Sequence, residues 1–192
     1  MRNSQRQTLI AEAMRLQDRR RFLPPELASA HDRDQPLPIG HGQTNSQPST
    51  VAAMLDLLEP FAGMRVMDVG SGSGWTAAIL GQLGGPDSQV VAVERIPTLV
   101  ERSREAIDLP WVEVHLAEPD VLGLPQLEPF DRILVSAMAE QAPTPLVNQL
   151  GDGGILVAPW AGTMHRVAKS GEEIQITAHG AYTFVPLIHA RF

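Results

Sequence analysis

Short apolar segments alternate with amphipathic segments through the middle of the chain. Segments with the length and pattern of strands lie at 65–69, 90–94, 112–116, 133–137 and 155–158. Helical periodicity lies between them, at 75–83, 99–107 and 144–150. Strands that alternate with helices predict a parallel sheet with helices on both faces. Three more segments that look like strands, at 166–169, 174–177 and 184–187, have no helices between them, so the sheet is expected to end in antiparallel strands.

The first 30 residues have a helical period. The stripe consists of Leu9, Ala13 and Leu16, with Ile10 and Met14 beside it. Pro24 and Pro25 are expected to end this helix, because proline cannot continue one. The basic run 19–21 is interpreted as a solvated helix end, where the helix dipole favours positive charge.

Residues 31–50 are rich in Pro, Gly, His, Gln and Ser, which predicts an irregular segment. A helix is predicted from Pro48, before Gly63. Its apolar face consists of Val51, Met54, Leu55 and Leu58.

These elements predict one α/β domain over 1–192, a Rossmann-like three-layer αβα fold with a mostly parallel sheet and antiparallel C-terminal strands. Within it we expect a helical N-terminal extension and loop at 1–47, a ligand-binding core at 48–160 and the C-terminal strands at 161–192.

Composition and charge restrict the function classes. The chain is 43% hydrophobic and 19% charged, which is typical of a globular protein. A net charge of −7 argues against nucleic acid as a partner. The absence of cysteine excludes disulfides, thiolate zinc sites and a cysteine nucleophile, and the six histidines lack ligand spacing, so no metal site is expected. No run of about 18 apolar residues and no signal peptide is found, which favours a cytoplasmic protein without a membrane span, and a monomer is expected.

A glycine turn, 70–74, follows the first predicted strand and its carboxylate, Asp68. Ligands of open parallel sheets bind outside the carboxyl ends of the strands, and glycines let the backbone approach them closely. A carboxylate here would repel a pyrophosphate, but it suits the amino group of S-adenosyl-L-methionine (AdoMet). A plain glycine turn of a nucleotide-binding fold is the alternative. The residues predicted to bind AdoMet here are Asp68, Gly70, Ser71, Gly72 and Gly74.

Acidic residues also follow the next two predicted strands. Glu94 ends the second strand, where a carboxylate can accept hydrogen bonds from both ribose hydroxyls, although it could instead pair with Arg95 or Arg102. After the third strand, Glu118 or Asp120 is a candidate acceptor for the adenine amino group, with a plain turn acid as the equal alternative.

Together these residues match the AdoMet-binding motif of class I methyltransferases. The segment Pro38-Ile39-Gly40-His41-Gly42-Gln43-Thr44-Asn45-Ser46-Gln47-Pro48 also resembles the G-Q-T-I-S-x-P segment of protein-L-isoaspartate O-methyltransferases. Further stretches similar to that family are 21–24, 94–97, 130–133, 149–154 and 184–187, in the family's order.

The resemblance implies a methyltransferase fold and transfer of a methyl group from AdoMet to the α-carboxylate of an isoaspartyl residue in a damaged peptide, after which the ester collapses to a succinimide. It implies that Ser46 is the active-site residue and that Thr44 helps to shape the site. The cofactor contacts that it implies are Gly70, Gly74, Glu94, Arg95 and Glu118. From residue chemistry alone, Ser46 and Thr44 would be helix caps ahead of Pro48, and His41 a structural loop residue.

The chain departs from the family pattern at four places. Asn45 stands where an apolar residue is usual, Ser49 replaces a larger ring residue, 117–119 replaces a Gly-Asp-Gly segment, and 159–162 stands where a Pro-Val-Gly segment is common. Two alternatives follow: a carboxyl methyltransferase acting on a different peptide aspartate, and an AdoMet-binding protein without turnover.

Overall fold

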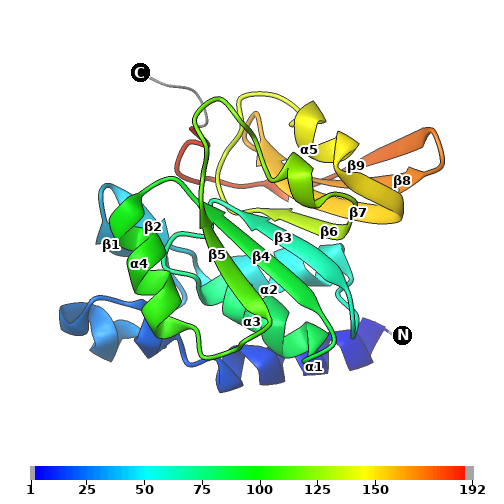
Figure 1. Ribbon diagram of the computed structural model, residues 1–192. Coiled ribbons are helices and arrows are strands. Elements are labelled where there is room, and N and C mark those ends of the chain that lie inside the picture. The colour runs from blue at the N-terminus through cyan, green and yellow to red at the C-terminus, as the bar shows by residue number, and fades with distance from the viewer. Residues whose placement is uncertain (1–2, 189–192) are drawn as a thin grey trace.

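A seven-stranded mixed sheet forms the centre of the computed structural model, which describes residues 3–188. Its strand order is β5-β4-β3-β6-β7-β8-β9. The first five of these strands are parallel: β5 (Val112–Leu116), β4 (Gln89–Glu94), β3 (Arg65–Val69), β6 (Phe130–Val135) and β7 (Leu150–Trp160). The last two are antiparallel: β8 (Thr163–Ser170) and β9 (Glu173–Ala181). The predicted parallel sheet with antiparallel C-terminal strands is confirmed (Figure 1).

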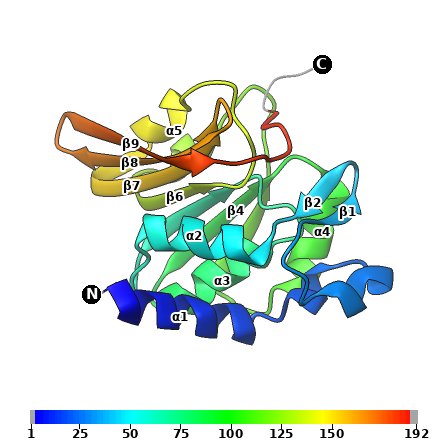
Figure 2. The ribbon, with the colours of Figure 1, turned by 180° about the vertical axis from the view of Figure 1, so that it is seen from behind.

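Helices cover both faces of the sheet. One face carries α2 (Pro48–Leu58), α3 (Trp75–Gly84) and α4 (Pro97–Ala106). α1 (Asn3–Leu16) packs outside α2 and α3, as Figure 2 shows from behind. The opposite face carries the short helix α5 (Thr144–Asn148) and the 3₁₀ turn η3 (Pro125–Leu127). The layers therefore agree with the predicted αβα arrangement.

Strand β3 shows why the central strands are almost wholly apolar. Val66 faces the α2 and α3 side, whereas Met67 and Val69 face the α5 side, and each of the three side chains is at most 3% exposed. A parallel strand covered on both faces has no solvent side that would call for alternating polar residues. The apolar face predicted for α2 is confirmed, since its four residues are all buried.

The N-terminal helix differs from its prediction. It ends at Leu16, before two 3₁₀ turns, η1 (Arg19–Phe22) and η2 (Pro25–Ala30). Its buried residues are Ile10 and Ala13, whereas Leu9 is 41% and Leu16 45% exposed. The predicted stripe was therefore centred one residue away from the stripe that packs on α3.

Two further predictions about the N-terminal region were wrong. Arg19 of the basic run is 3% exposed, not solvated, because it binds backbone carbonyls inside the extension. The segment predicted to be irregular contains the hairpin β1 (Leu37–Gly40) and β2 (Gln43–Asn45). Leu37 and Ile39 bury the hairpin's apolar face in a small separate cluster with Leu99 of α4.

The predicted strand at 184–187 is not a strand of the sheet. It makes an isolated bridge with the segment after β6, where Leu187 N–H donates to the carbonyl of Met138 at 2.7 Å. Pro186 lacks the N–H that a regular ladder would need. The predicted parts 1–47 and 161–192 extend into residues 1–2 and 189–192, which lie outside the described residues. Within 3–188, no helix is long and apolar enough to cross a membrane.

Candidate active site

The site lies where β3, β4 and β6 end. From β3 the chain continues to β4 and β5 on one side of the sheet and then crosses to β6 on the other side. The carboxyl ends of β3, β4 and β6 therefore lie at a topological switch point of the sheet. Gly70, Glu94 and Ser136 stand at or just beyond the three carboxyl ends. The fold thus brings residues from separate parts of the sequence to one place.

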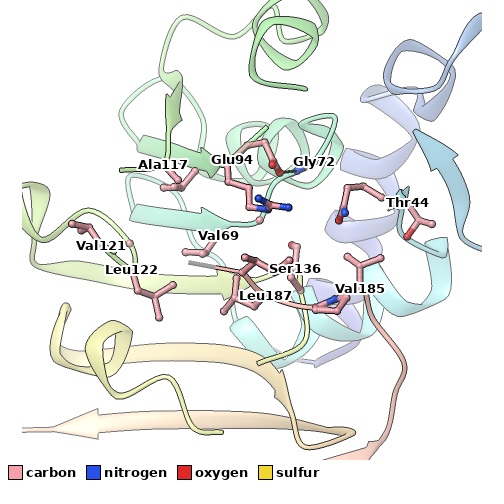
Figure 3. Close-up of a pocket in the computed structure, with 18 residues that line it drawn as sticks. Thr44, Val69, Gly72, Glu94, Ala117, Val121, Leu122, Ser136, Val185 and Leu187 are labelled. Atoms are coloured by element: carbon pink, nitrogen blue, oxygen red, sulfur yellow. Dashed lines mark hydrogen bonds between the residues drawn. The ribbon is translucent and has the colours of Figure 1, made fainter. Parts of the chain in front are cut away.

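A first cavity opens at this edge and holds about 640 Å³ of empty space, including the part open to solvent (Figure 3). Its polar wall includes Gln43, Thr44, Glu94, Arg95 and Ser136, and apolar side chains form much of the rest. The apolar lining residues that Figure 3 labels are Val69, Ala117, Val121, Leu122, Val185 and Leu187.

Glu94 is tied to the glycine turn. Its Oε2 accepts a hydrogen bond from Gly72 N–H at 2.9 Å, and its Oε1 accepts one from Ile96 N–H at 2.9 Å. Each carboxylate oxygen can accept a second bond, so the cavity side of the group remains able to bind hydroxyls. The glycine turn itself has positive φ angles of 75°, 56° and 87° at Gly70, Gly72 and Gly74.

Asp68 lies behind the glycine turn and lines neither cavity. It is fully buried, and its Oδ1 accepts a hydrogen bond from Ser136 Oγ at 2.8 Å. Its Oδ2 has no hydrogen-bond partner among the described residues. Burial raises the pKa of Asp68 to about 7, with the Ser136 hydrogen bond opposing the rise and the charge of Glu94 adding to it. A buried, unpaired carboxylate oxygen favours a cation nearby.

A second, smaller cavity of about 270 Å³ adjoins the first. The two share Thr44, Gly70, Gly72 and Ser136 as walls. The second cavity is rich in hydroxyl groups, and no ionisable side chain is among the described residues that line it. The remaining lining residues are Asn45, Ser46, Ser71, Ser73, Trp75 and Thr76.

The structure places most predicted site residues at these cavities. Thr44 lines both cavities, Ser46 and Ser71 the second, and Glu94 and Arg95 the first. Helix capping does not explain Ser46 or Thr44, since α2 has Gln47 as its N-cap and no side-chain cap bond.

Several predicted residues lie outside both linings. Glu118 and Asp120 line neither cavity, and Ala117 faces the first cavity instead. Gly74 also lies outside both linings and is the N-cap of α3. His41 does not reach the cavities, and its Nε2 lies 2.8 Å from Thr98 Oγ1, in a hydrogen bond.

Sequence analysis missed several lining residues, among them Ser136 and the segment 185–188. Ser136 follows directly after β6, and its place beyond a buried strand is the signal that would have found it. The segment 185–188 folds across the first cavity through its bridge to Met138, and no local pattern indicated this. No group of three or more potential metal ligands occurs within residues 3–188.

Comparison with known families gives a match over residues 2–191 to the model of protein-L-isoaspartate(D-aspartate) O-methyltransferase. This match covers nearly the whole chain. The chain belongs to the protein-L-isoaspartate O-methyltransferase family. The predicted enzyme class, the isoaspartyl methyltransferase activity and AdoMet as cofactor are thereby confirmed.

Relatives in this family share much of the sequence. A protein-L-isoaspartate O-methyltransferase of Methanococcoides burtonii is 41% identical over 186 residues, which are 93% of this chain and 91% of that protein. One from Aeropyrum pernix is 47% identical over 154 residues, 78% of this chain but only 59% of the longer relative.

Solved structures show the same fold. A Plasmodium falciparum chain described as a protein-L-isoaspartate O-methyltransferase, in complex with S-adenosyl-L-homocysteine (AdoHcy), superposes with a TM-score of 0.80 at 25% identity, covering 96% of this chain and 98% of that one. A second structure under the family's name reaches a TM-score of 0.79 at 22% identity and covers 94% of this chain and 65% of that one.

The residues of the first cavity fit AdoMet. Glu94 offers a carboxylate to a ribose, the apolar walls suit an adenine ring, and the unpartnered Oδ2 of Asp68 marks the glycine turn as a place that favours positive charge. AdoMet carries such charge on its amino group and its sulfonium.

Proposed function

We propose that the two cavities hold the two reactants of isoaspartyl methylation, the methyl donor in the first and the substrate carboxylate in the second. Their shared wall of Thr44, Gly70, Gly72 and Ser136 supports this arrangement, because it places the two spaces against each other. Transfer of a methyl group depends mainly on such alignment of the attacking oxygen with the carbon.

The observation that carries the proposal is the chemistry of the second cavity. Its described lining holds hydroxyl, amide and indole groups but no ionisable side chain. An amine, amide or hydroxyl acceptor would need a base to remove its proton, whereas a carboxylate is already ionised at neutral pH. The cavity therefore suits a carboxylate better than any acceptor that must first lose a proton.

Ser46 is proposed to orient that carboxylate. Its side chain is half-buried in the second cavity, and its hydroxyl can donate one hydrogen bond to an oxygen without neutralising the charge. Thr44, on the wall of both cavities, is proposed to shape the same passage.

AdoMet supplies a methyl group on a positively charged sulfur: a lone pair of the carboxylate oxygen forms the new O–C bond while the S–C electrons return to sulfur. Positive and negative charges thus disappear together, and the products are a neutral thioether centre and a neutral ester. The apolar wall of the first cavity does not oppose a reaction that disperses charge.

Glu94, Arg95 and the glycine turn 70–74 are proposed to hold the donor, with Asp68 acting from behind the turn. A role for Glu118 at the adenine is also proposed, although its side chain is exposed and lies outside the lining described above.

The test is methylation of an isoaspartyl peptide with labelled AdoMet beside its aspartyl twin. Base-labile label is expected on the isoaspartyl peptide only. Ser46→Ala is expected to lower kcat about tenfold to a hundredfold, the value of one hydrogen bond to a charged group. Ser170→Ala, at an exposed serine outside both cavities, is the matched control and should keep full activity.

Two results would contradict the assignment. Label on the aspartyl twin would favour a carboxyl methyltransferase for a different aspartate. AdoHcy binding by calorimetry without product on either peptide would indicate an AdoMet-binding protein without turnover. A monomeric state, a cytoplasmic location and the absence of nucleic-acid partners are part of the same proposal and rest on composition and charge.

A further inference from the structure

Arg19 is the most heavily hydrogen-bonded side chain of the N-terminal extension. It is 3% exposed, and its guanidinium lies 5.3 Å from the ring centre of Trp75. Its two Nη atoms donate to backbone carbonyls on both sides of the β1–β2 hairpin, namely those of His31, Arg33, Gln35, Asn45 and Ser46. The arginine therefore fixes the backbone on which Thr44 and Ser46 stand.

The remaining donor of Arg19 is used for a side chain. Arg19 Nε donates to Asn45 Oδ1 at 2.7 Å, and Asn45 Nδ2 donates to Ser73 Oγ at 3.2 Å. A guanidinium has only donors, so the amide oxygen of Asn45 must face it and the amide NH₂ must face Ser73. The orientation of the amide is thus dictated by its buried neighbours.

The Asn45–Ser73 hydrogen bond joins two segments of the active site. Asn45 lies between Thr44 and Ser46, and Ser73 lies in the glycine turn between Gly72 and Gly74. Asn45 and Ser73 are 5% and 3% exposed, so water does not compete for the two bonds. In such surroundings an unmade hydrogen bond is costly, which makes the bridge stiff.

We propose that Asn45 is a positioning residue that couples the two cavities: through Arg19 on one side and Ser73 on the other, it transmits donor binding at the glycine turn to the segment carrying Thr44 and Ser46. This inference rests on the proposed function for the role of those two residues. A bound methyl donor orders the glycine turn and thereby fixes Ser73, and Ser73 then fixes Asn45 and its neighbours. Coupling of this kind is reciprocal, so a bound substrate must also tighten the donor.

The first test does not depend on turnover. Hydrogen exchange of residues 43–47 is measured with and without AdoHcy. In the unaltered protein AdoHcy is expected to slow exchange about fivefold or more, a common size for coupling between sites. In Asn45→Leu, which keeps the branched shape but makes no hydrogen bonds, and in Ser73→Ala, the slowing should fall below about twofold while the turn 70–74 remains protected.

Conservative rescue separates coupling from simple stability. Asn45→Asp still accepts from Arg19 and can accept from the Ser73 hydroxyl, so it should keep the slowing. Gln82→Leu is the matched control: Gln82 also binds the extension, through Gln17 Nε2 at 3.1 Å, but lies outside both cavities. This control should leave exchange of 43–47 and all kinetic constants unchanged.

The second test uses the substrate. An isoaspartyl peptide is expected to lower the Kd for AdoHcy about fivefold in the unaltered protein and to leave it nearly constant in Asn45→Leu, with KM for the peptide raised. If the unaltered protein methylates no peptide, the proposed function fails while the exchange result stands by itself.

Equal slowing in the unaltered protein, Asn45→Leu and Ser73→Ala would overturn the coupling, as would the absence of any slowing in the unaltered protein. Should Asn45→Leu fail to fold, Ser73→Ala decides the question, since it removes one hydroxyl at little change in volume.

Discussion

Substitution of Gly74 by alanine tests how the glycine turn is built. Gly74 is the N-cap of α3, with φ of 87° and ψ of 5°. A Cβ added there would lie 2.9 Å from Ile107 Cδ1 and 3.0 Å from both Cβ and Oγ of Ser103. The end of Ile107 can move, but Ser103 is fully buried and donates to the carbonyl of Gly72 at 3.0 Å. The new methyl group therefore pushes against a side chain that holds the turn.

The expected loss has two parts. A left-handed conformation costs alanine about 1–2 kcal/mol relative to glycine. Overpacking against a fixed neighbour adds about 1–3 kcal/mol. Gly74→Ala should therefore lower the free energy of unfolding by about 2–5 kcal/mol. Because Gly72 must shift with Ser103, AdoHcy binding should also weaken, although Gly74 lines neither cavity.

Gly63→Ala is the matched control. Gly63 has φ of 77°, but a Cβ there would meet nothing within 4 Å. Only the conformational part applies, so urea unfolding should show a loss of about 1–2 kcal/mol, and calorimetry should show unchanged AdoHcy affinity. Equal losses of stability in the two variants would refute the packing part of the argument. Unchanged AdoHcy affinity in Gly74→Ala would refute the link through Ser103.

Two further predictions concern charge and assembly. The pKa of Asp68, about 7 in the fold against 3.8 when unperturbed, means that the folded state holds a proton that the unfolded chain releases between these values. The stability that protonated Asp68 contributes is therefore fully present below about pH 4 and is lost as the pH rises to about 7. The free energy of unfolding should fall by about 4 kcal/mol over this range. The free energies of unfolding of the unaltered protein and of Asp68→Asn are measured from pH 4 to pH 8, and the unaltered protein should lose stability relative to the variant as the pH rises. A gap between the two proteins that does not change with pH would contradict this prediction. Light scattering should give the mass of one chain, 20.8 kDa, and twice that mass would contradict the monomer.

The parallel core could be predicted closely because its elements are defined by local patterns. The strands at 65–69 and 112–116 were predicted with the observed bounds, since the first is a largely apolar segment, the second alternates apolar with polar residues, and each lies beside a turn. Strand β7 is longer than predicted because Leu150 already pairs with Phe130 of β6, and residues 151–154 form an irregular stretch before pairing resumes at Ile155. Pairing between strands is a tertiary effect that a turn-forming composition does not show.

The site was predictable where residues follow strands and less so where distant segments meet. Glu94 was found because it ends a strand beside the glycine turn. The segment 185–188 was not, since its place on the cavity depends on bonds to Met138, far away in the sequence. Asp68 was expected to face the ligand, but it lies behind the turn and lines neither cavity.

Arg19 shows why composition misleads at such a place. A run of three arginines favours a solvated helix end, because most arginines are exposed. Nothing local distinguishes Arg19 from its neighbours, yet it alone of the three is buried, since five carbonyls of the hairpin region need a donor and Asn45 needs a partner. Arg19 is thus buried because backbone carbonyls at 31–35 and 45–46 accept hydrogen bonds from its guanidinium. The N-terminal extension, which supplies Arg19, is therefore part of the active site. Without Arg19 the carbonyls of Asn45 and Ser46 would lose the hydrogen bonds that hold this segment in place.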